Sequence, residues 1–123
     1  MARKLAKSTL TRLRLRLVEE QVRLESMIEE FDRQREQSRL AETSSEHNAD
    51  PDNADVGSLA FEMEMDLSIE QNAKELLEKV ERALKRMDEG TYGDCEVSGK
   101  PIPIARLEAL PYATTTVENA GRV

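Results

Sequence analysis

The sequence predicts a mainly all-α protein, in which a long antiparallel coiled-coil hairpin carries a small C-terminal head. Charged residues make up 35% of the 123 residues and aromatic residues only 3%, a composition typical of long helices with a thin core. Two segments with a helical hydrophobic repeat are separated by a polar stretch. These observations predict a hairpin over residues 1–90 and a head over residues 91–123.

The first arm of the hairpin is predicted to begin near Ser8. Apolar residues then recur seven apart and continue beside that stripe, at Leu10, Leu17, Leu24 and Phe31, with Leu13, Met27 and Ile28. A seven-residue spacing keeps such side chains facing one partner helix, as in a coiled coil. If the arm continues to about residue 40, it is roughly 50 Å long at 1.5 Å per residue.

The hydrophobic repeat stops over residues 41–58, where Ser, Asn, Asp, Thr and Pro predominate, so we predict the exposed tip loop there. Pro51 disfavours helical geometry at Asp50. Residues 41–66 contain eight acidic residues and no Lys or Arg. Loops displayed on a rigid scaffold often carry binding groups, so the acidic tip is the first candidate site.

The second arm is predicted to begin near Ser58. Its apolar residues alternate at spacings of mainly three and four, at Leu59, Met63, Ala73, Leu77, Val80, Leu84 and Met87. Asp66 and Glu70 lie within that stripe. Either water reaches them near an open end of the hairpin, or they mark a kink or a shift of the stripe towards Leu67 and Ile69, and the sequence leaves these alternatives open.

Glycine and proline divide the head into short elements. Gly90 is predicted to cap the second arm, and Cys95 to Pro101 to form a tight turn with a short ribbon. Pro103 can open a short helix that Pro111 closes.

Charge and composition exclude several classes of partner. The net charge of −7 argues against general nucleic-acid binding, because proteins that neutralise phosphates usually have a basic balance, and no direct sequence-specific DNA binding is expected. No apolar run approaches the roughly 18 to 20 residues of a membrane span, so no membrane partner is expected. The single cysteine, Cys95, rules out an internal disulfide and fits a reducing compartment, so we expect a cytoplasmic protein.

The acidic tip does not match a calcium-binding loop. If Asp50 began an EF-hand, the glycine position would hold Asp55 and the bidentate position Phe61. A loose magnesium contact within a larger assembly remains open, because magnesium needs only one or two carboxylates.

Catalysis has no support in the sequence. His47 is the only histidine, which excludes a Ser-His-Asp triad or a multi-histidine metal cluster within one chain. Asp94 and Glu96 flank Cys95 and are expected to raise the pKa of its thiol, which disfavours a nucleophile. We therefore predict that the protein is not an enzyme.

The C-terminal residues carry a specific resemblance. The run from Glu89 to Cys95, followed by Ser98-Gly99, Pro101-Ile102-Pro103, Arg106-Leu107-Glu108-Ala109 and Pro111, resembles the C-terminal motif of the DksA/TraR family of bacterial transcription regulators. The resemblance implies a hairpin that enters the secondary channel of RNA polymerase, with a tip motif of two aspartates three apart and then an alanine. Alignment without a gap from Cys95 places Asp52, Asp55 and Gly57 on these positions.

The family's head holds zinc with four cysteines, and those positions here read Cys95, Ser98, Thr116 and Asn119. Hydroxyls and an amide cannot replace thiolates in a tetrahedral zinc site, so zinc is expected to be absent. Packing would then hold the head, through the apolar groups of Tyr92, Val97, Ile102, Ile104, Leu107, Leu110 and Tyr112.

The resemblance also implies basic groups around a guanosine tetraphosphate site. Lys79 and Arg106 match basic positions of the family, whereas Leu110 stands where a basic residue is found. The loss of one charged contact weakens an anion site and leaves dependence on the nucleotide doubtful.

Together these features predict a monomeric, non-catalytic regulator that inserts its tip into the secondary channel of RNA polymerase, as core or holoenzyme, and modulates initiation. The alternative is a coiled-coil interaction or scaffolding protein that keeps the fold without binding polymerase.

Overall fold

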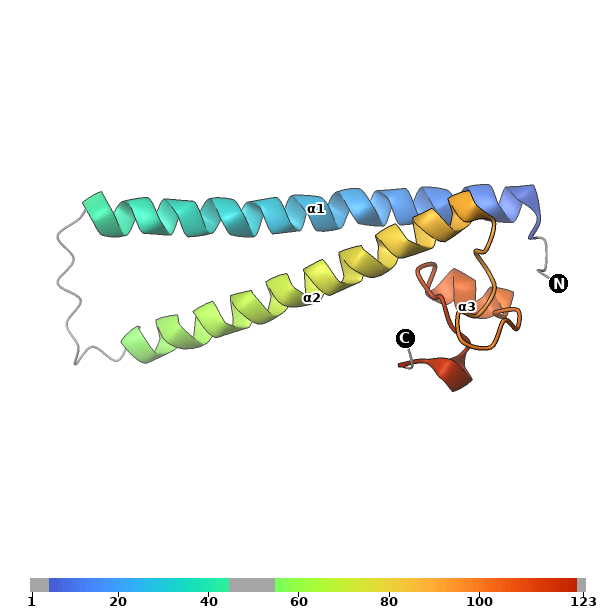
Figure 1. Cartoon of the computed structure of the whole chain (residues 1–123). Coiled ribbons are helices and arrows are strands. Elements are labelled where there is room, and N and C mark those ends of the chain that lie inside the picture. Colours follow the sequence, from blue (N-terminus) through green and yellow to red (C-terminus); the bar gives the residue numbers. More distant parts are fainter. Residues whose placement is uncertain (1–4, 45–54, 122–123) are drawn as a thin grey trace. The chain divides into compact units, whose positions relative to one another are not determined.

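The computed structural model describes the backbone of residues 5–44 and 55–121, and no side chain from residue 42 to 56. Its helices are α1 (Lys7–Ser44), α2 (Asp55–Glu89) and α3 (Ile104–Ala109), followed by the 3₁₀ helix η1 (Val117–Asn119). Within the described ranges there is no strand. Two long helices form a hairpin (Figure 1), which confirms the predicted all-α class.

Both long helices extend further towards the tip than the sequence suggested. The predicted loop over residues 41–58 is too long, because α1 continues to Ser44 and α2 already begins at Asp55. Ala41 and Glu42 are residue types that favour helix interiors, and aspartate is among the types that favour a helix start. Residues 45–54 lie outside the described part of the chain.

The chain divides into two compact units, and the division differs from the predicted boundary at residue 90. One unit joins residues 1–23 to residues 76–123, so the head clusters with one end of each long helix. The other unit comprises residues 24–75. Within each unit, the parts of α1 and α2 are antiparallel (Figure 1).

The core of the first unit is shared by α1, α2 and the head. Its buried apolar residues are Leu13, Leu17, Val80, Ala83, Tyr92, Cys95, Ile102, Leu107 and Ala113. The predicted core position of Leu17 is therefore confirmed, as are those of Ile102 and Leu107 in the head.

Two apolar residues of the head do not pack as predicted. Val97 and Ile104 are each 45% exposed. Val97 lies inside the turn that the Cys95 N–H closes on the Lys100 carbonyl at 2.8 Å, where the chain reverses at the surface. Ile104 is the first residue of α3, and this six-residue helix buries only Leu107.

The end of α2 is fastened to the head through Arg86. Gly90 has a φ of +80°, and the Thr91 N–H donates to the Arg86 carbonyl at 2.9 Å, which confirms the predicted glycine cap. The Arg86 guanidinium donates to the carbonyls of Thr91 and Asp94 and pairs with Glu96 at 3.4 Å. One side chain thus satisfies two turn carbonyls and a carboxylate.

The basic N-terminal part of α1 is also used inside the first unit. Arg12 pairs with the Glu108 carboxylate, and Arg16 donates to the Glu108 carbonyl next to the end of α3. Arg14 pairs with Asp88 of α2 at 3.0 Å. This basic part of α1 therefore contributes contacts to both α2 and the head.

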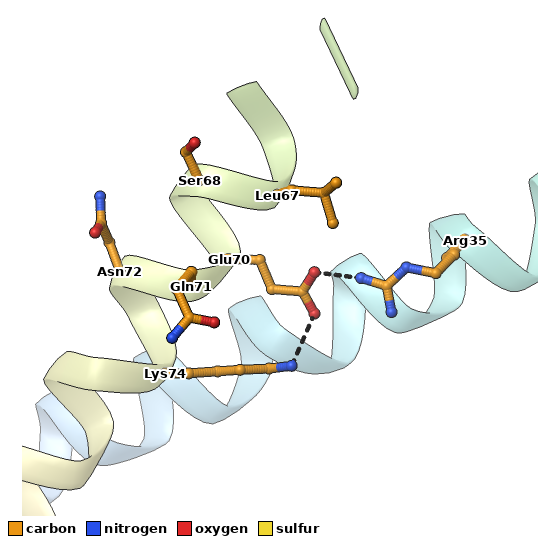
Figure 2. A pocket seen from close by; sticks show the side chains of 7 residues that line it. All are labelled: Arg35, Leu67, Ser68, Glu70, Gln71, Asn72 and Lys74. Carbon is orange, nitrogen blue, oxygen red and sulfur yellow. Dashed lines mark hydrogen bonds and ion pairs between the residues drawn. The ribbon is translucent and has the colours of Figure 1, made fainter. Parts of the chain in front are cut away.

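In the second unit, Glu70 is buried to 4% exposure. Figure 2 shows its carboxylate between Arg35 of α1 and Lys74, one turn further along α2. A buried carboxylate is tolerated when cations pair with it. Glu70 thus keeps its place in the stripe by pairing with cations, whereas Asp66 is exposed.

The predicted seam between the helices does not continue to the tip. Leu59 and Met63 were expected on it but are 58% and 66% exposed. All residues described from 57 to 69 on α2, and from 32 to 41 on α1, are exposed. The apolar packing of the second unit is instead centred on Leu24 and Ala73.

We predict that Arg86→Ala lowers the free energy of unfolding by about 3 kcal/mol, since it leaves two turn carbonyls without a charged donor and removes one of the two cations that pair with Glu96. Urea unfolding followed by circular dichroism measures the change. The matched control is Arg33→Ala, which removes an exposed ion pair between Arg33 and Glu30, both in α1. This control should leave the unfolding midpoint unchanged. Equal effects of the two substitutions would contradict the anchoring role of Arg86.

Candidate functional site

The tip positions are only partly described. Asp52 lies outside the described residues, and Asp55 is the first residue of α2, with its side chain undescribed. Gly57 is exposed in the first turn of α2, and a Cβ added there would meet no atom within 4 Å. The helical backbone therefore has room for alanine at this position.

The four positions matching the family's metal ligands are drawn together at one end of the head. The Cys95–Pro101 turn is closed by the Gly99 N–H, which donates to the Cys95 carbonyl at 2.9 Å. Asp94 and Pro101 form an isolated antiparallel β-bridge. This confirms the predicted tight turn, but in place of the predicted short ribbon the described part of the head has only this one bridge. The turn supplies Cys95 and Ser98, whereas Thr116 caps η1 and Asn119 ends it.

Side-chain hydrogen bonds connect three of these positions. Asn119 Nδ2 lies 3.6 Å from Cys95 Sγ, and Thr116 Oγ1 lies 3.9 Å from the same sulfur. Asn119 Nδ2 also donates to Thr116 Oγ1 at 3.2 Å. Ser98 Oγ accepts from the Lys100 N–H at 3.3 Å. We call Cys95, Ser98, Thr116 and Asn119 the knuckle.

The thiol of Cys95 does not have the raised pKa expected from its acidic neighbours. Burial raises the pKa, but hydrogen bonds from the Ser98 side chain and from the N–H groups of Ser98, Thr116 and Val97 lower it to about 6. The prediction was wrong because Glu96 is paired with Arg82 and Arg86, and because several donors converge on the sulfur.

Lys79 and Arg106, the predicted nucleotide or polymerase contacts, lie in different settings. Lys79 is exposed on α2, whereas Arg106 is half-buried in α3 and its Nε donates to the Thr115 carbonyl at 2.8 Å. In the described part of the chain no hydrogen bond or ion pair joins the two. Leu110 is half-buried where α3 ends.

Among residues 5–44 and 55–121, no group of three or more His, Cys, Asp or Glu side chains is placed to hold a metal ion. A search of the same residues finds no helix with the length and apolarity of a membrane span.

Two features of the second unit were missed by the sequence analysis. One is the ion-paired cluster of Glu70 with Arg35 and Lys74, beside a hollow that is also lined by Leu67, Ser68, Gln71 and Asn72 (Figure 2). The other is a set of exposed apolar side chains between Leu59 and Ile69. The signal for the second was present, since large apolar residues occupy every second position there, a spacing that places them on more than one side of a helix.

Comparison with known proteins gives the relationships of the chain. Residues 90–122 match the family model described as a prokaryotic dksA/traR C4-type zinc finger. The chain is 51% identical over 65 residues to general stress protein 16O of Bacillus subtilis, covering 53% of this chain and 40% of that protein. It is 41% identical over 71 residues to the RNA polymerase-binding transcription factor DksA of Caulobacter vibrioides, covering 58% and 50%. The matches thus span half or less of these relatives.

A solved structure extends the similarity to nearly the whole chain. Transcription factor DksA2 from Pseudomonas aeruginosa matches with a TM-score of 0.69 and 29% identity, over 94% of this chain and 83% of that one. The long helices are therefore matched as well as the head.

The residues of the knuckle do not fit the zinc that the name of the family model implies. Zinc in structural sites takes four thiolate or imidazole ligands, and the knuckle offers one thiol, two hydroxyls and an amide. The amide nitrogen of Asn119 is directed at the sulfur as a donor, an arrangement that makes the sulfur a hydrogen-bond acceptor. With the C-terminal motif, the hairpin and these matches in agreement, the chain belongs to the DksA/TraR family.

Proposed function

We propose that this chain is a non-catalytic transcription regulator that binds bacterial RNA polymerase. The support is its similarity to proteins named as an RNA polymerase-binding transcription factor and as a transcription factor, over a hairpin and head of the same kind. The described residues offer no cluster of metal-binding side chains that would suggest a reaction of its own.

The proposed mode of action is insertion of the tip into the secondary channel, where Asp52 and Asp55 contact polar or basic groups and modulate initiation. The observation that carries it is the acidic tip between two long helices: α1 ends at Ser44, α2 begins at Asp55, and residues 41–66 contain no Lys or Arg. Attraction between charges is stronger in a low-dielectric channel than at an open surface, so a short acidic segment can act there.

We further propose that the head folds without zinc. In place of four metal–ligand bonds, the knuckle has the contacts from Thr116 and Asn119 to the sulfur, and Ile102 and Leu107 are wholly buried in the head. Tyr92 adds a buried hydrogen bond to the Pro111 carbonyl at 2.8 Å, and burial raises the pKa of this phenol to about 12, although nearby Arg16 lowers it. The phenol therefore stays a donor at neutral pH.

A response to guanosine tetraphosphate is expected to be weak. Arg106 already donates to the Thr115 carbonyl, and Leu110 supplies no charge. Of the three positions, only the exposed Lys79 has its charge fully available to an anion.

The tip is tested by the double variant Asp52→Asn and Asp55→Asn, which removes two charges without changing side-chain size. We expect it to bind core polymerase but to lose most of its effect on transcription from a ribosomal RNA promoter, measured in vitro. Gly57→Ala is the companion variant. It should stabilise the start of α2 by about 1 kcal/mol and leave the effect equal or stronger. An unchanged effect of the double variant would show that the tip carboxylates are not the acting groups.

The absence of zinc is tested by elemental analysis of purified protein, with an expected zinc content far below one per chain. A chelator should leave the thermal midpoint unchanged, because no metal–ligand bond is lost. One zinc per chain, or a fall in the midpoint on chelation, would overturn the proposal.

The pKa of Cys95 gives a separate prediction. A pKa lowered to about 6 stabilises the folded state fully only above the unfolded value of about 8.5, and that contribution is lost as pH falls through 6. The free energy of unfolding of wild type relative to Cys95→Ser should therefore rise between pH 6 and 8.5. Thiolate absorbance in the folded wild type should titrate with a midpoint near 6, and a midpoint above 8.5 would refute the assignment.

A further inference from the structure

Six large apolar side chains are exposed within a short segment of α2. They are Leu59, Phe61, Met63, Met65, Leu67 and Ile69, with exposed fractions between 43% and 66%. Single exposed apolar residues are ordinary at protein surfaces, but a contiguous set usually marks an interaction site. We call these six residues the apolar segment.

One half of the apolar segment points away from α1. At about 100° per residue, Met63 lies about 20° around α2 from Glu70, and Glu70 pairs with Arg35 of α1 (Figure 2). Met65 lies about 140° from Glu70, so the residues in line with Met65 form a ridge that α1 does not face. This outer ridge consists of Phe61, Met65 and Ile69, spaced four apart.

A second exposed apolar surface lies on α1. Leu15, Val18 and Val22 are 59%, 39% and 57% exposed, and their spacing of three and four puts them on one side of the helix. Val22 lies about 140° around α1 from Leu17, which is buried in the core of the first unit. These three residues, which we call the α1 stripe, therefore point away from that core.

The two surfaces carry opposite charges in the same arrangement. An exposed carboxylate stands on each side of Met65 in the sequence, and an exposed guanidinium stands on each side of Leu15. The carboxylates belong to Glu64 and Asp66, and the guanidiniums to Arg14 and Arg16. Residues 40–73 contain no Lys or Arg, and residues 5–18 contain no Asp or Glu. Such complementarity steers two surfaces together and disfavours wrong partners.

The two arginines remain accessible although each has a contact within its own chain. Arg14 pairs with Asp88 at 3.0 Å, but its side chain is 49% exposed. Arg16 donates to the Glu108 carbonyl and is also exposed. A guanidinium has five N–H donors, and an exposed ion pair holds it only weakly. Both side chains can therefore donate to a carboxylate of another molecule.

Contacts between identical surfaces are disfavoured by the same charges. Two outer ridges would place carboxylates against carboxylates, and two α1 stripes would place guanidiniums against guanidiniums. An outer ridge against an α1 stripe instead covers apolar side chains on both surfaces and sets carboxylates opposite guanidiniums. Each chain thus carries both halves of one complementary contact.

We propose that the outer ridge of one copy docks on the α1 stripe of a second copy, so that the protein self-associates. Because the contact joins two different surfaces, it either forms twice in a closed dimer or links further copies. A monomer was expected from the sequence, where neither surface was recognised. The inference stands independently of the proposed function.

The test measures the molar mass of full-length protein by sedimentation equilibrium, from about 1 µM to about 1 mM, the range of weak to moderate affinities. We expect the mass of wild type to rise above that of one chain. Phe61→Ser with Met65→Ser removes the outer ridge, and Leu15→Ser with Val22→Ser removes the α1 stripe. Each variant should associate at least about tenfold more weakly than wild type. Circular dichroism establishes that the variants fold.

The matched control is Ile104→Ser with Val117→Ser, which changes two apolar side chains of the head that are 45% and 70% exposed. This control should associate like wild type. An equal loss of association in the control would contradict the assignment to the outer ridge and the α1 stripe.

Mixing the two surface variants identifies the partner surface. The outer-ridge variant keeps an intact α1 stripe, and the α1-stripe variant keeps an intact outer ridge. The mixture should therefore associate more strongly than either variant alone. If the α1-stripe variant alone associates like wild type, the outer ridge pairs with another surface and the proposal is wrong.

The charges are tested by Glu64→Gln with Asp66→Asn. This variant should associate more weakly than wild type and with a smaller dependence on salt concentration. Association that is insensitive to salt and to these substitutions would overturn the charge argument that selects the partner. Wild-type protein that stays monomeric over the whole concentration range would overturn the proposal itself and leave the apolar segment to a different protein.

Discussion

The contacts of Arg86 hold the head to the hairpin, and the first unit depends on them. Arg86 donates to two carbonyls of the turn after α2 and shares Glu96 with Arg82. Because Glu96 is next to Cys95, the same pairing fixes where the knuckle begins. The Glu96 N–H then donates to the Thr114 carbonyl at 2.8 Å, which brings the C-terminal segment back to the turn. Arg86 thus contacts the chain from Thr91 to Glu96, and the backbone bond of Glu96 joins this turn to Thr114.

The knuckle illustrates how a site can keep its backbone while its chemistry changes. Hydroxyls and an amide occupy three positions where the family has thiolates, and two of these side chains point donors at the remaining sulfur. Hydrogen-bond donors stabilise a thiolate just as they stabilise other anions, and the lowered pKa of Cys95 comes from the Ser98 side chain and the backbone N–H groups of Ser98, Thr116 and Val97. Under our proposal, the stability that zinc would supply comes from this network and from the buried Tyr92, Ile102 and Leu107.

Much of the fold could be predicted from local sequence signals. The glycine cap at Gly90 and the proline at the start of α3 depend on backbone conformation, which a residue type determines by itself, and the seven-residue repeat located buried Leu17 and Leu24. The exposure of Val97 could not be predicted, because it depends on where a turn reverses in three dimensions. The burial of Glu70 required knowing that Arg35, distant in sequence, would pair with it.

The candidate sites divide in the same way. The four knuckle positions were identified from the resemblance to the family's four-cysteine head, and the structure draws them together. The pKa of Cys95 was predicted to be raised, but it is lowered. The prediction considered only the acidic residues next to Cys95 in the sequence, which do not reveal the hydrogen-bond donors that the fold brings to the sulfur. The tip assignment of Asp52 and Asp55 remains a prediction, since Asp52 and the side chain of Asp55 lie outside the described residues. The apolar segment was missed because Leu59 and Met63 were assigned to a seam with α1.

The most direct test of the account is crosslinking from the hairpin to RNA polymerase. A photoreactive residue would be placed at position 57, 61 or 22 of the full-length chain, and its crosslinks to core polymerase mapped. We expect position 57 to crosslink to segments that line the secondary channel near the active centre, position 61 to segments that line its walls, and position 22 to neither. Crosslinks from position 57 to the outer surface of polymerase alone, or no crosslink from positions 57 and 61, would contradict the account.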